Sequence, residues 1–391
     1  MRNHRIWYGV LLLLAIVLFL VADNSAAVIL LAGLIVLPAI SGILQFAAMR
    51  SVQIECKIKK LSYVKQEQFF EIELKKGNTI PMGALELEVE AENILYDEKR
   101  IHRLVLQPVE KREQLFQYQM DLQDCGQIKI RVLTAHFYDL MGIFQIRRKL
   151  DLAAEILVYP TELRLNIQKN RRPEAEAVGE LYDPLRKGQD VNEVSGLRNY
   201  MDGDSLGSIH WKLSGKMDEL IVRELGYPSN YRTVLICDIM KKIGDQEIDN
   251  EQNNAILALT ASLSRSMLEA NMEHMLVKVS DGECRPIPIH TMGEHDDMVL
   301  ETLCRPIEEK KDGEDSLYYF LRSNLVHLCT KVIYITSHFD SEEARQLSRN
   351  LDLTILHVGM EDRTGYTDMH GYSVMPVQAK NYEDKLHTIV I

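Results

Sequence analysis

The chain has 391 residues, enough for two or three folded domains, and its 46% hydrophobic and 7% aromatic residues exclude wholesale disorder and collagen-like repeats. Its 45 basic and 57 acidic residues give a formal net charge of −12 at pH 7. This balance, without any basic tract, excludes a nucleic-acid-binding protein, because neutralising phosphates requires clustered Lys and Arg.

Two apolar segments near the N-terminus predict a transmembrane hairpin over residues 1–49. Its helices are expected at about residues 6–22 and 26–48, with a short polar turn between them. The first is at the lower limit for crossing about 30 Å of hydrocarbon, and the second is comfortably long. A cleaved signal peptide is the alternative, but the segment after such a cut is itself apolar enough to span. The hairpin is therefore the favoured interpretation.

The positive charges around the hairpin predict its orientation in the cell membrane. The turn carries only Asp23, whereas basic residues precede the first helix and follow the second: Arg2, Arg5, Arg50, Lys57, Lys59 and Lys60. Because short cytoplasmic segments carry the excess of Lys and Arg, we expect a multi-pass protein with two spans and both termini in the cytoplasm. In that reducing compartment the six cysteines are expected to be mostly free thiols.

Residues 50–160 show the two-residue alternation of half-buried strands. Val52, Ile54 and Cys56 alternate with polar residues. The pattern recurs in four later segments, at residues 70–74, 85–90, 116–120 and 128–132. Short strands without long amphipathic helices between them predict an antiparallel β-sandwich. We expect this domain to be a spacer or a binding module, since no catalytic residues mark it.

Residues 161–190 intermix basic and acidic side chains and contain two prolines, which predicts a linker or an extended arm. Residues 233–238 then form a continuous apolar run ending in an acid, as expected of a strand buried on both faces. Residues 256–267 repeat apolar side chains at helical spacing, and strand and helix patterns go on alternating. Residues 191–391 are therefore predicted to form an α/β domain with a mostly parallel sheet and helices on both faces.

The most specific segment, residues 196–224, follows the predicted arm. A turn at Gly203-Asp204 is expected to lead into a short helix and then a strand. Asp204 among nearby basic residues suggests a charge-assisted network with Arg198, Lys212 and Arg223. Two interpretations stay open: an ordered clasp, in which Trp211 is buried, and a partner-binding surface. The candidate residues are Arg198, Tyr200, Gly203, Asp204, Ile209, Trp211, Lys212, Arg223 and Glu224.

These residues resemble the signature of domain-of-unknown-function family 58. The matching phrases are Leu197-Arg198-Asn199-Tyr200, Gly203-Asp204, Ile209-His210-Trp211-Lys212 and Val222-Arg223-Glu224, with upstream landmarks at residues 139–144 and 158–160. The resemblance implies an N-terminal membrane hairpin, a β-rich region and a domain similar to von Willebrand factor type A. One departure is that Leu206, Gly207 and Ser208 stand where the family usually has an arginine.

The resemblance also implies partners, because such proteins are generally encoded beside MoxR-type AAA+ ATPases and transglutaminase-like membrane proteins. It therefore implies a membrane-tethered adaptor for such an ATPase in the assembly of envelope proteins or protein complexes. Neither an enzymatic activity nor a cofactor is expected.

Two rival functions stay open. A cation-dependent type A adhesion module needs Asp-x-Ser-x-Ser after its first strand, and this chain has a degenerate version at Asp238, Met240 and Lys242, so no metal is expected. An unrecognised hydrolase is the other rival, although nothing in the sequence singles out one cysteine as its nucleophile. Ser214-Gly215-Lys216 resembles the end of a P-loop, but His210 and Met217 stand where the motif needs Gly and Ser or Thr.

Overall fold

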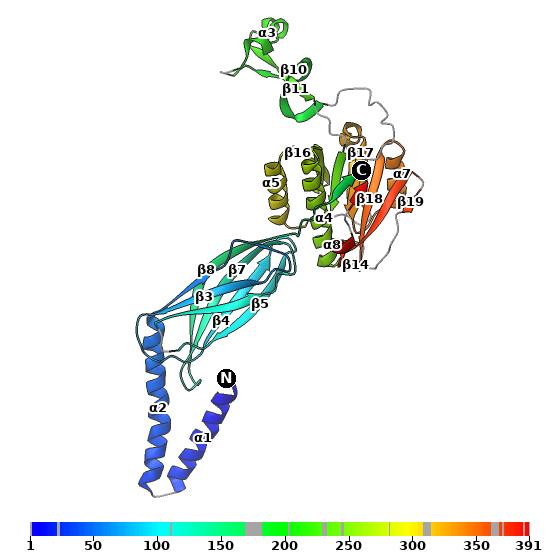
Figure 1. Cartoon of the computed structure of the whole chain (residues 1–391). Helices are drawn as coiled ribbons and strands as arrows, with labels where there is room; N and C mark the ends of the chain where they lie inside the picture. Colours follow the sequence, from blue (N-terminus) through cyan, green and yellow to red (C-terminus); the bar gives the residue numbers. More distant parts are fainter. Residues whose placement is uncertain are drawn as a thin grey trace. The chain divides into compact units, whose positions relative to one another are not determined.

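The computed structural model describes residues 2–21, 24–109, 112–168, 182–201, 204–228, 233–243, 246–280, 282–307, 314–360, 367–369, 371–385 and 388–390. The chain forms two compact units (Figure 1). The first comprises Met1–Thr161 with Leu300–Ile307, and the second comprises Glu162–Val299 with Glu308–Ile391. The chain is thus multidomain, with an apolar helix near its N-terminus followed by sheets and several further helices.

Two helices begin the first unit, α1 (Arg2–Val21) and α2 (Ser25–Arg50). They contact each other, and the Tyr8 hydroxyl donates a hydrogen bond of 2.7 Å to the Leu34 carbonyl. Among the described helices, α2 has the length and composition to cross a membrane, with a mean hydropathy of 2.6 over its most apolar stretch. The apolar part of α1, Arg5–Val21, is shorter. The sequence therefore contains one helix that fits a membrane span or a signal segment.

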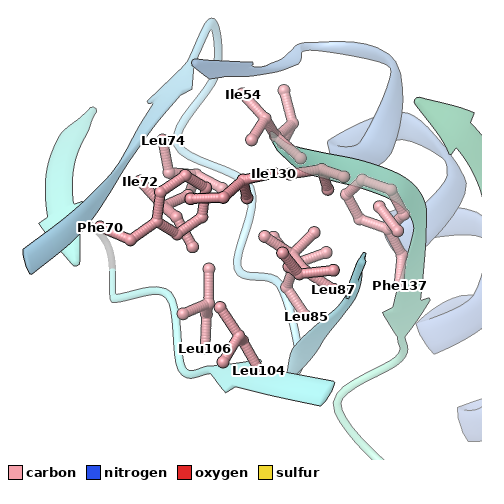
Figure 2. Close-up of a cluster of buried hydrophobic side chains, with 14 of the residues drawn as sticks. Ile54, Phe70, Ile72, Leu74, Leu85, Leu87, Leu104, Leu106, Ile130 and Phe137 are labelled. Carbon is pink, nitrogen blue, oxygen red and sulfur yellow. The ribbon is translucent and has the colours of Figure 1, made fainter. Parts of the chain in front are cut away.

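The rest of the first unit is built from two sheets that share one core. The three-stranded sheet has the order β1 (Val52–Lys57), β3 (Gln68–Lys76) and β6 (Glu113–Met120). The five-stranded sheet has the order β2 (Leu61–Tyr63), β8 (Gln145–Tyr159), β7 (Gly126–Tyr138), β4 (Leu85–Asn93) and β5 (Glu98–Leu106). Phe70, Ile72 and Leu74 from one sheet meet Leu85 and Phe137 from the other (Figure 2).

The second unit contains a seven-stranded sheet. Its order is β16 (Glu283–Ile289), β15 (His274–Ser280), β12 (Thr233–Asp238), β17 (Lys331–Thr336), β18 (Asp352–Gly359), β20 (Tyr372–Gln378) and β19 (Thr367–Met369). The five central strands are parallel, and β16 and β19 pair antiparallel at the edges. Two short pairs accompany it, β9 (Asn166–Gln168) with β21 (Thr388–Val390), and β13 (Lys242–Ile243) with β14 (Gln246–Glu247).

Helices cover both faces of this sheet. The core of one face contains side chains from α6 (Ser316–Arg322) and α7 (Ser341–Ser348). Alternate residues of the strands, such as Leu235 and Ile333, point to the other face and are also fully buried. The helix α4 (Asn250–Glu269) contacts β12 and β17. The predicted helical spacing in residues 256–267 is confirmed, because these apolar side chains form the buried face of α4. The described part also contains α5 (Met292–Leu303), α8 (Tyr382–Lys385) and the 3₁₀ turn η2 (Asn324–Leu328).

The signature forms a small module of two strands and two helical turns. Its elements are β10 (Tyr182–Asn199), η1 (Leu206–Ser208), α3 (Trp211–Met217) and β11 (Ile221–Pro228). Residues 182–190 of the predicted arm form the first part of β10, and residues 169–181 lie outside the described residues. The single helix expected after the turn is wrong. It is divided at Ile209, because this residue leaves helical geometry to form a β-bridge with Val222.

Candidate functional sites

The predicted charge network in the signature is present at Asp204. Both guanidinium nitrogens of Arg198 donate to its carboxylate, at 2.7 and 2.6 Å, and the backbone N–H of Met201 donates to it at 2.8 Å. Such bidentate pairs fix geometry because two parallel bonds resist rotation. Asp204 is thus attached both to Arg198 in β10 and to the backbone of Met201. The turn residue Gly203 lies outside the described residues.

Backbone and hydroxyl bonds attach α3 to β11. The N–H of Ile221 donates to Ser214 Oγ at 2.9 Å, and the same hydroxyl donates to the His210 carbonyl at 3.1 Å. The N–H of His210 donates to the Ile221 carbonyl at 2.8 Å. Ser214, in the segment that resembles a P-loop end, therefore has a structural role within the module.

The apolar side chains of the module divide into a small interior and a large exposed set. Ile209, Ile221 and Val222 are buried. Trp211 is the first residue of the seven-residue helix α3 and is 64% exposed. Its burial, expected under the clasp interpretation, is therefore wrong. We call the exposed apolar set the signature surface: Leu197, Met201, Leu206, Trp211, Met217 and Leu220.

The other predicted residues lie around this surface. Lys212 is exposed on α3, and Tyr200 is half-buried, with its N–H donating to the Leu220 carbonyl at 2.8 Å. Arg223 pairs with Leu197 across β10 and β11, and its Nε is buried without a hydrogen-bond partner among the described residues. The backbone of Glu224 pairs with Gly196. Of the three basic partners expected for Asp204, the structure supplies Arg198.

A second polar site lies at the carboxyl end of β12, beside β17. Asp238 is fully buried there and accepts hydrogen bonds from the hydroxyls of Ser316 (2.8 Å), Tyr334 and Thr336 (3.4 Å). The carboxyl edge between such strands is where open α/β sheets bind ligands. In this chain, however, hydroxyl groups already occupy the carboxylate oxygens that a cation needs. The other two residues of the degenerate motif do not join it: the backbone of Met240 is bonded to Asn253, and Lys242 is exposed.

Further acids surround the start of α6. Asp315 accepts a bond of 2.8 Å from the N–H of Tyr318, and the N–H of Asp340 donates to its other oxygen at 3.3 Å. Burial, with help from a hydrogen bond to Asp315, raises the pKa of Glu343 to about 8. Asp315 and Asp340 are thus the N-caps of α6 and α7. The described residues contain no group of three or more His, Cys, Asp or Glu side chains placed to hold a metal ion.

Sequence reasoning missed an interior relay in the second unit. Ser264 Oγ lies 2.9 Å from Nδ1 of His295, whose Nε2 lies 3.5 Å from Glu162 Oε1. Ser264 also bonds Nε2 of His274 at 2.8 Å. Serine, histidine and carboxylate also make up a hydrolase triad, but there the serine bonds Nε2 and the carboxylate Nδ1, whereas here Ser264 lies at Nδ1 and Nε2 has no hydrogen-bond partner among the described residues. Ser264 and both histidines also have 0% exposure. No pattern in the sequence predicts this relay, because its residues come from segments that are distant in the chain.

The six cysteines are free, and several are poor nucleophiles. Burial raises the pKa of Cys56 to about 11 and that of Cys329 to about 12, and it raises the pKa of Cys125 further still. A raised pKa keeps the thiol protonated, and the thiolate is the reactive form. These three cysteines therefore lack the setting of a catalytic thiol.

The upstream landmark at residues 139–144 has a structural role. Asp139 is 2% exposed and accepts a bond of 2.7 Å from the N–H of Phe144. Its other oxygen accepts a bond of 2.8 Å from the Ser41 hydroxyl, which attaches α2 to the end of β7. A Cβ on Gly42 would lie 3.2 Å from the Phe144 ring, so this helix approaches the turn closely.

Residues 196–333 match the sequence profile of a family described as "Protein of unknown function DUF58". The chain therefore contains a DUF58 region. This confirms the resemblance that the signature motifs predict. The DUF58 match begins in β10 and ends in β17, so it includes the signature module from residue 196 on, Asp238 and α4.

The uncharacterized protein YeaD of Bacillus subtilis (strain 168) is 23% identical to this chain over 178 residues. This alignment covers 46% of the chain and 42% of YeaD, so the chain spans less than half the length of that relative.

Solved structures resemble only a part of the chain. The CARDB domain of a Pyrococcus furiosus protein gives a TM-score of 0.19 at 16% identity, covering 27% of this chain and 91% of the domain. A cohesin module from Clostridium perfringens gives 0.22 at 12% identity, covering 28% of this chain and 96% of the module. Likenesses this weak carry no argument about the DUF58 chain.

Proposed function

We propose that this DUF58 chain is a membrane-tethered, non-enzymatic adaptor that binds a protein partner through its signature surface. The observation that carries the proposal is the 64% exposure of Trp211 inside the family-matched segment. Exposed tryptophans in apolar patches are the side chains that most often dominate binding energy at interfaces. The Arg198–Asp204 pair supports this role, because a preorganised loop loses less conformational entropy on binding.

The partner that the family resemblance suggests is a MoxR-type AAA+ ATPase, with a transglutaminase-like membrane protein as a second member of the assembly. We further propose that α1 and α2 both cross the cell membrane, with the termini in the cytoplasm, where such an ATPase is found. The sheet of the second unit is proposed to be a type A-like domain. Its mostly parallel strands and the carboxylate that ends β12 support this assignment.

The chemistry of the candidate sites favours an adaptor over the two rivals. Asp238 is saturated by hydroxyl donors, which disfavours a cation-dependent adhesion module. The relay of Ser264 is inaccessible to any substrate, and the buried cysteines are held as thiols, which disfavours a hydrolase.

The test is a binding measurement with the full chain in detergent and the MoxR-type ATPase encoded by the same genome. Trp211→Ala is expected to weaken the complex at least tenfold, because it truncates the proposed anchor. Leu61→Ala is the matched control, since Leu61 is an exposed apolar residue at 49% but lies in β2. The proposal is wrong if the unaltered chain does not bind the ATPase, or if both variants bind it equally.

A further inference from the structure

The β-sandwich of the first unit contains a cavity. It has a volume of about 320 Å³ and lies where β4 ends and β5 begins. Its interior walls are apolar side chains of both sheets, among them Phe70, Val89 and Ile130. Polar and charged side chains line it as well, among them Arg100, His102 and Tyr118, and the exposure of Arg100 and Tyr118 places these two at its mouth. Apolar cavities with a few polar groups at the rim are typical ligand sites.

The strand β6 beside this cavity is an unusual edge strand. It is the last strand of the three-stranded sheet, so one row of its backbone groups points away from the sheet. Natural edges are normally protected by charges or proline, yet after Glu113 at its start β6 contains neither, from Gln114 to Met120. Leu115 is 55% exposed and Tyr118 is 40% exposed. The other edge near the cavity, β5, has the usual protection from Lys99 and Arg103.

The inner face of β6 leads directly to the cavity. Phe116 and Met120 pack against the shared core, so by alternation Tyr118 lies on the same inner face. The Tyr118 ring contacts the His102 ring of β5, with 6.3 Å between their centroids. The outer edge of β6, with which none of the described strands pairs, and the mouth of the cavity are therefore adjacent.

We propose that β6 accepts an extended peptide as a fourth strand of its sheet, with one large apolar side chain of that peptide seated in the cavity. A strand added beside β6 runs about 4.8 Å away and points every second side chain toward the inner face. In this mode of recognition, backbone hydrogen bonds supply affinity and a side-chain pocket supplies specificity. We infer a peptide because the strand edge and the apolar pocket lie next to each other, and an extended peptide contacts both. A small apolar molecule would occupy the pocket but leave the strand edge unpaired.

The cavity part of the proposal is tested with variants of the full chain in detergent. Random octapeptides are selected on the unaltered chain, and the dissociation constants of the selected peptides are measured. Ala91→Phe fills the cavity from its wall and is expected to weaken binding at least tenfold. Ala153→Phe is the matched control, since Ala153 is exposed on β8 of the same sandwich and is expected to bind normally. Tyr118→Lys places a charge at the rim and supplies a second variant should Ala91→Phe disturb folding.

The strand part is tested on the peptide itself. N-methylation of alternate peptide nitrogens on the edge that faces β6 removes its hydrogen-bond donors and is expected to weaken binding at least tenfold. Methylation of the opposite edge is expected to have little effect, and binding is expected to slow hydrogen exchange in β6. The proposal is overturned if no peptide is selected, if binding ignores methylation, or if it survives both Ala91→Phe and Tyr118→Lys. Self-association through β6 that Tyr118→Lys abolishes, without peptide binding, identifies a second copy as the occupant and also overturns it.

Discussion

Arg198 and Asp204 make the contact that defines the signature at the scale of single residues. Their side chains are 26% and 19% exposed, so water screens the pair only in part. The carboxylate also accepts the N–H of Met201, which makes it the centre of the loop rather than one end of a surface ion pair. Trp211, by contrast, makes little contact with the module that carries it. We therefore expect the Arg198–Asp204 pair to contribute to the stability of the signature module, and Trp211 to contribute to the binding of a partner.

Asp204→Ala is expected to destabilise the signature module by about 1–3 kcal/mol, because it removes charge-assisted bonds and leaves Arg198 without its carboxylate. The measurement is hydrogen exchange of the β10 and β11 amides. Trp211→Ala is the comparison, with an expected change within about 0.5 kcal/mol, as for other exposed positions. Equal protection in Asp204→Ala and the unaltered chain would contradict the role given to this pair.

His274 makes the second unit sensitive to acid. Burial disfavours its charged form and lowers its pKa to about 4, from a model-peptide value of 6.5. Between these two pH values the unfolded chain binds the extra proton, so stability is complete above pH 6.5 and falls as the pH drops toward 4. One such group changes the unfolding free energy by about 1.4 kcal/mol per pH unit within this window.

His274→Gln is expected to flatten this acid dependence, because glutamine carries no titrating proton. The measurement is urea unfolding at pH 7 and pH 5, followed by hydrogen exchange in α4 and β15. His338→Gln serves as the control, since His338 is exposed, and it should retain the full loss between the two pH values. An unchanged slope in His274→Gln would show that another group controls the acid response.

At the scale of elements, β16 and α6 are two for which the local sequence gives a weak signal. β16 contains Pro286 and Pro288, and it forms because it lies at the edge of the sheet, where a missing N–H costs least. α6 has only seven residues and depends on its cap Asp315 and on the burial of Phe320. Residues such as Leu259 and Leu263 in the long α4 reveal themselves by period alone, because a 20-residue helix repeats its pattern several times.

The carboxyl edge of the sheet gives a prediction about metals. Titration with Mg²⁺ or Mn²⁺ is expected to leave the thermal midpoint of the chain unchanged, because Ser316, Tyr334 and Thr336 already donate to Asp238. If the folded chain bound the ion, a free ion concentration of 100 times the dissociation constant would raise the free energy of unfolding by about 2.7 kcal/mol. A rise in the midpoint that Asp238→Asn abolishes would restore the adhesion-module hypothesis.

At the scale of the whole molecule, the open question is which parts of the chain cross the membrane. α2 alone has the length and apolar character of a span among the described helices, and a second span depends on α1. The two helices contact each other, and the side chain of Asn24 caps the start of α2.

The proposed topology predicts that a membrane-impermeant maleimide labels Asn24→Cys in intact bacterial spheroplasts. The six native cysteines are the internal control, because they should react only after lysis and denaturation. Labelling of a native cysteine in intact cells contradicts a cytoplasmic body. An intact mass that lacks the N-terminal residues contradicts a two-span anchor and supports a cleaved signal segment.

The sequence by itself determined the features that repeat locally or occur as motifs. Alternation in residues such as Val52 and Ile54, the apolar run of α2 and the signature phrases predicted strands, an apolar helix and the DUF58 region. Tertiary structure alone decided the exposure of Trp211, the saturation of Asp238 and the cavity beside β6. The physical reason is that burial and hydrogen-bond partners depend on which distant segments pack together, as Ser316 and Asp238 do across 78 positions.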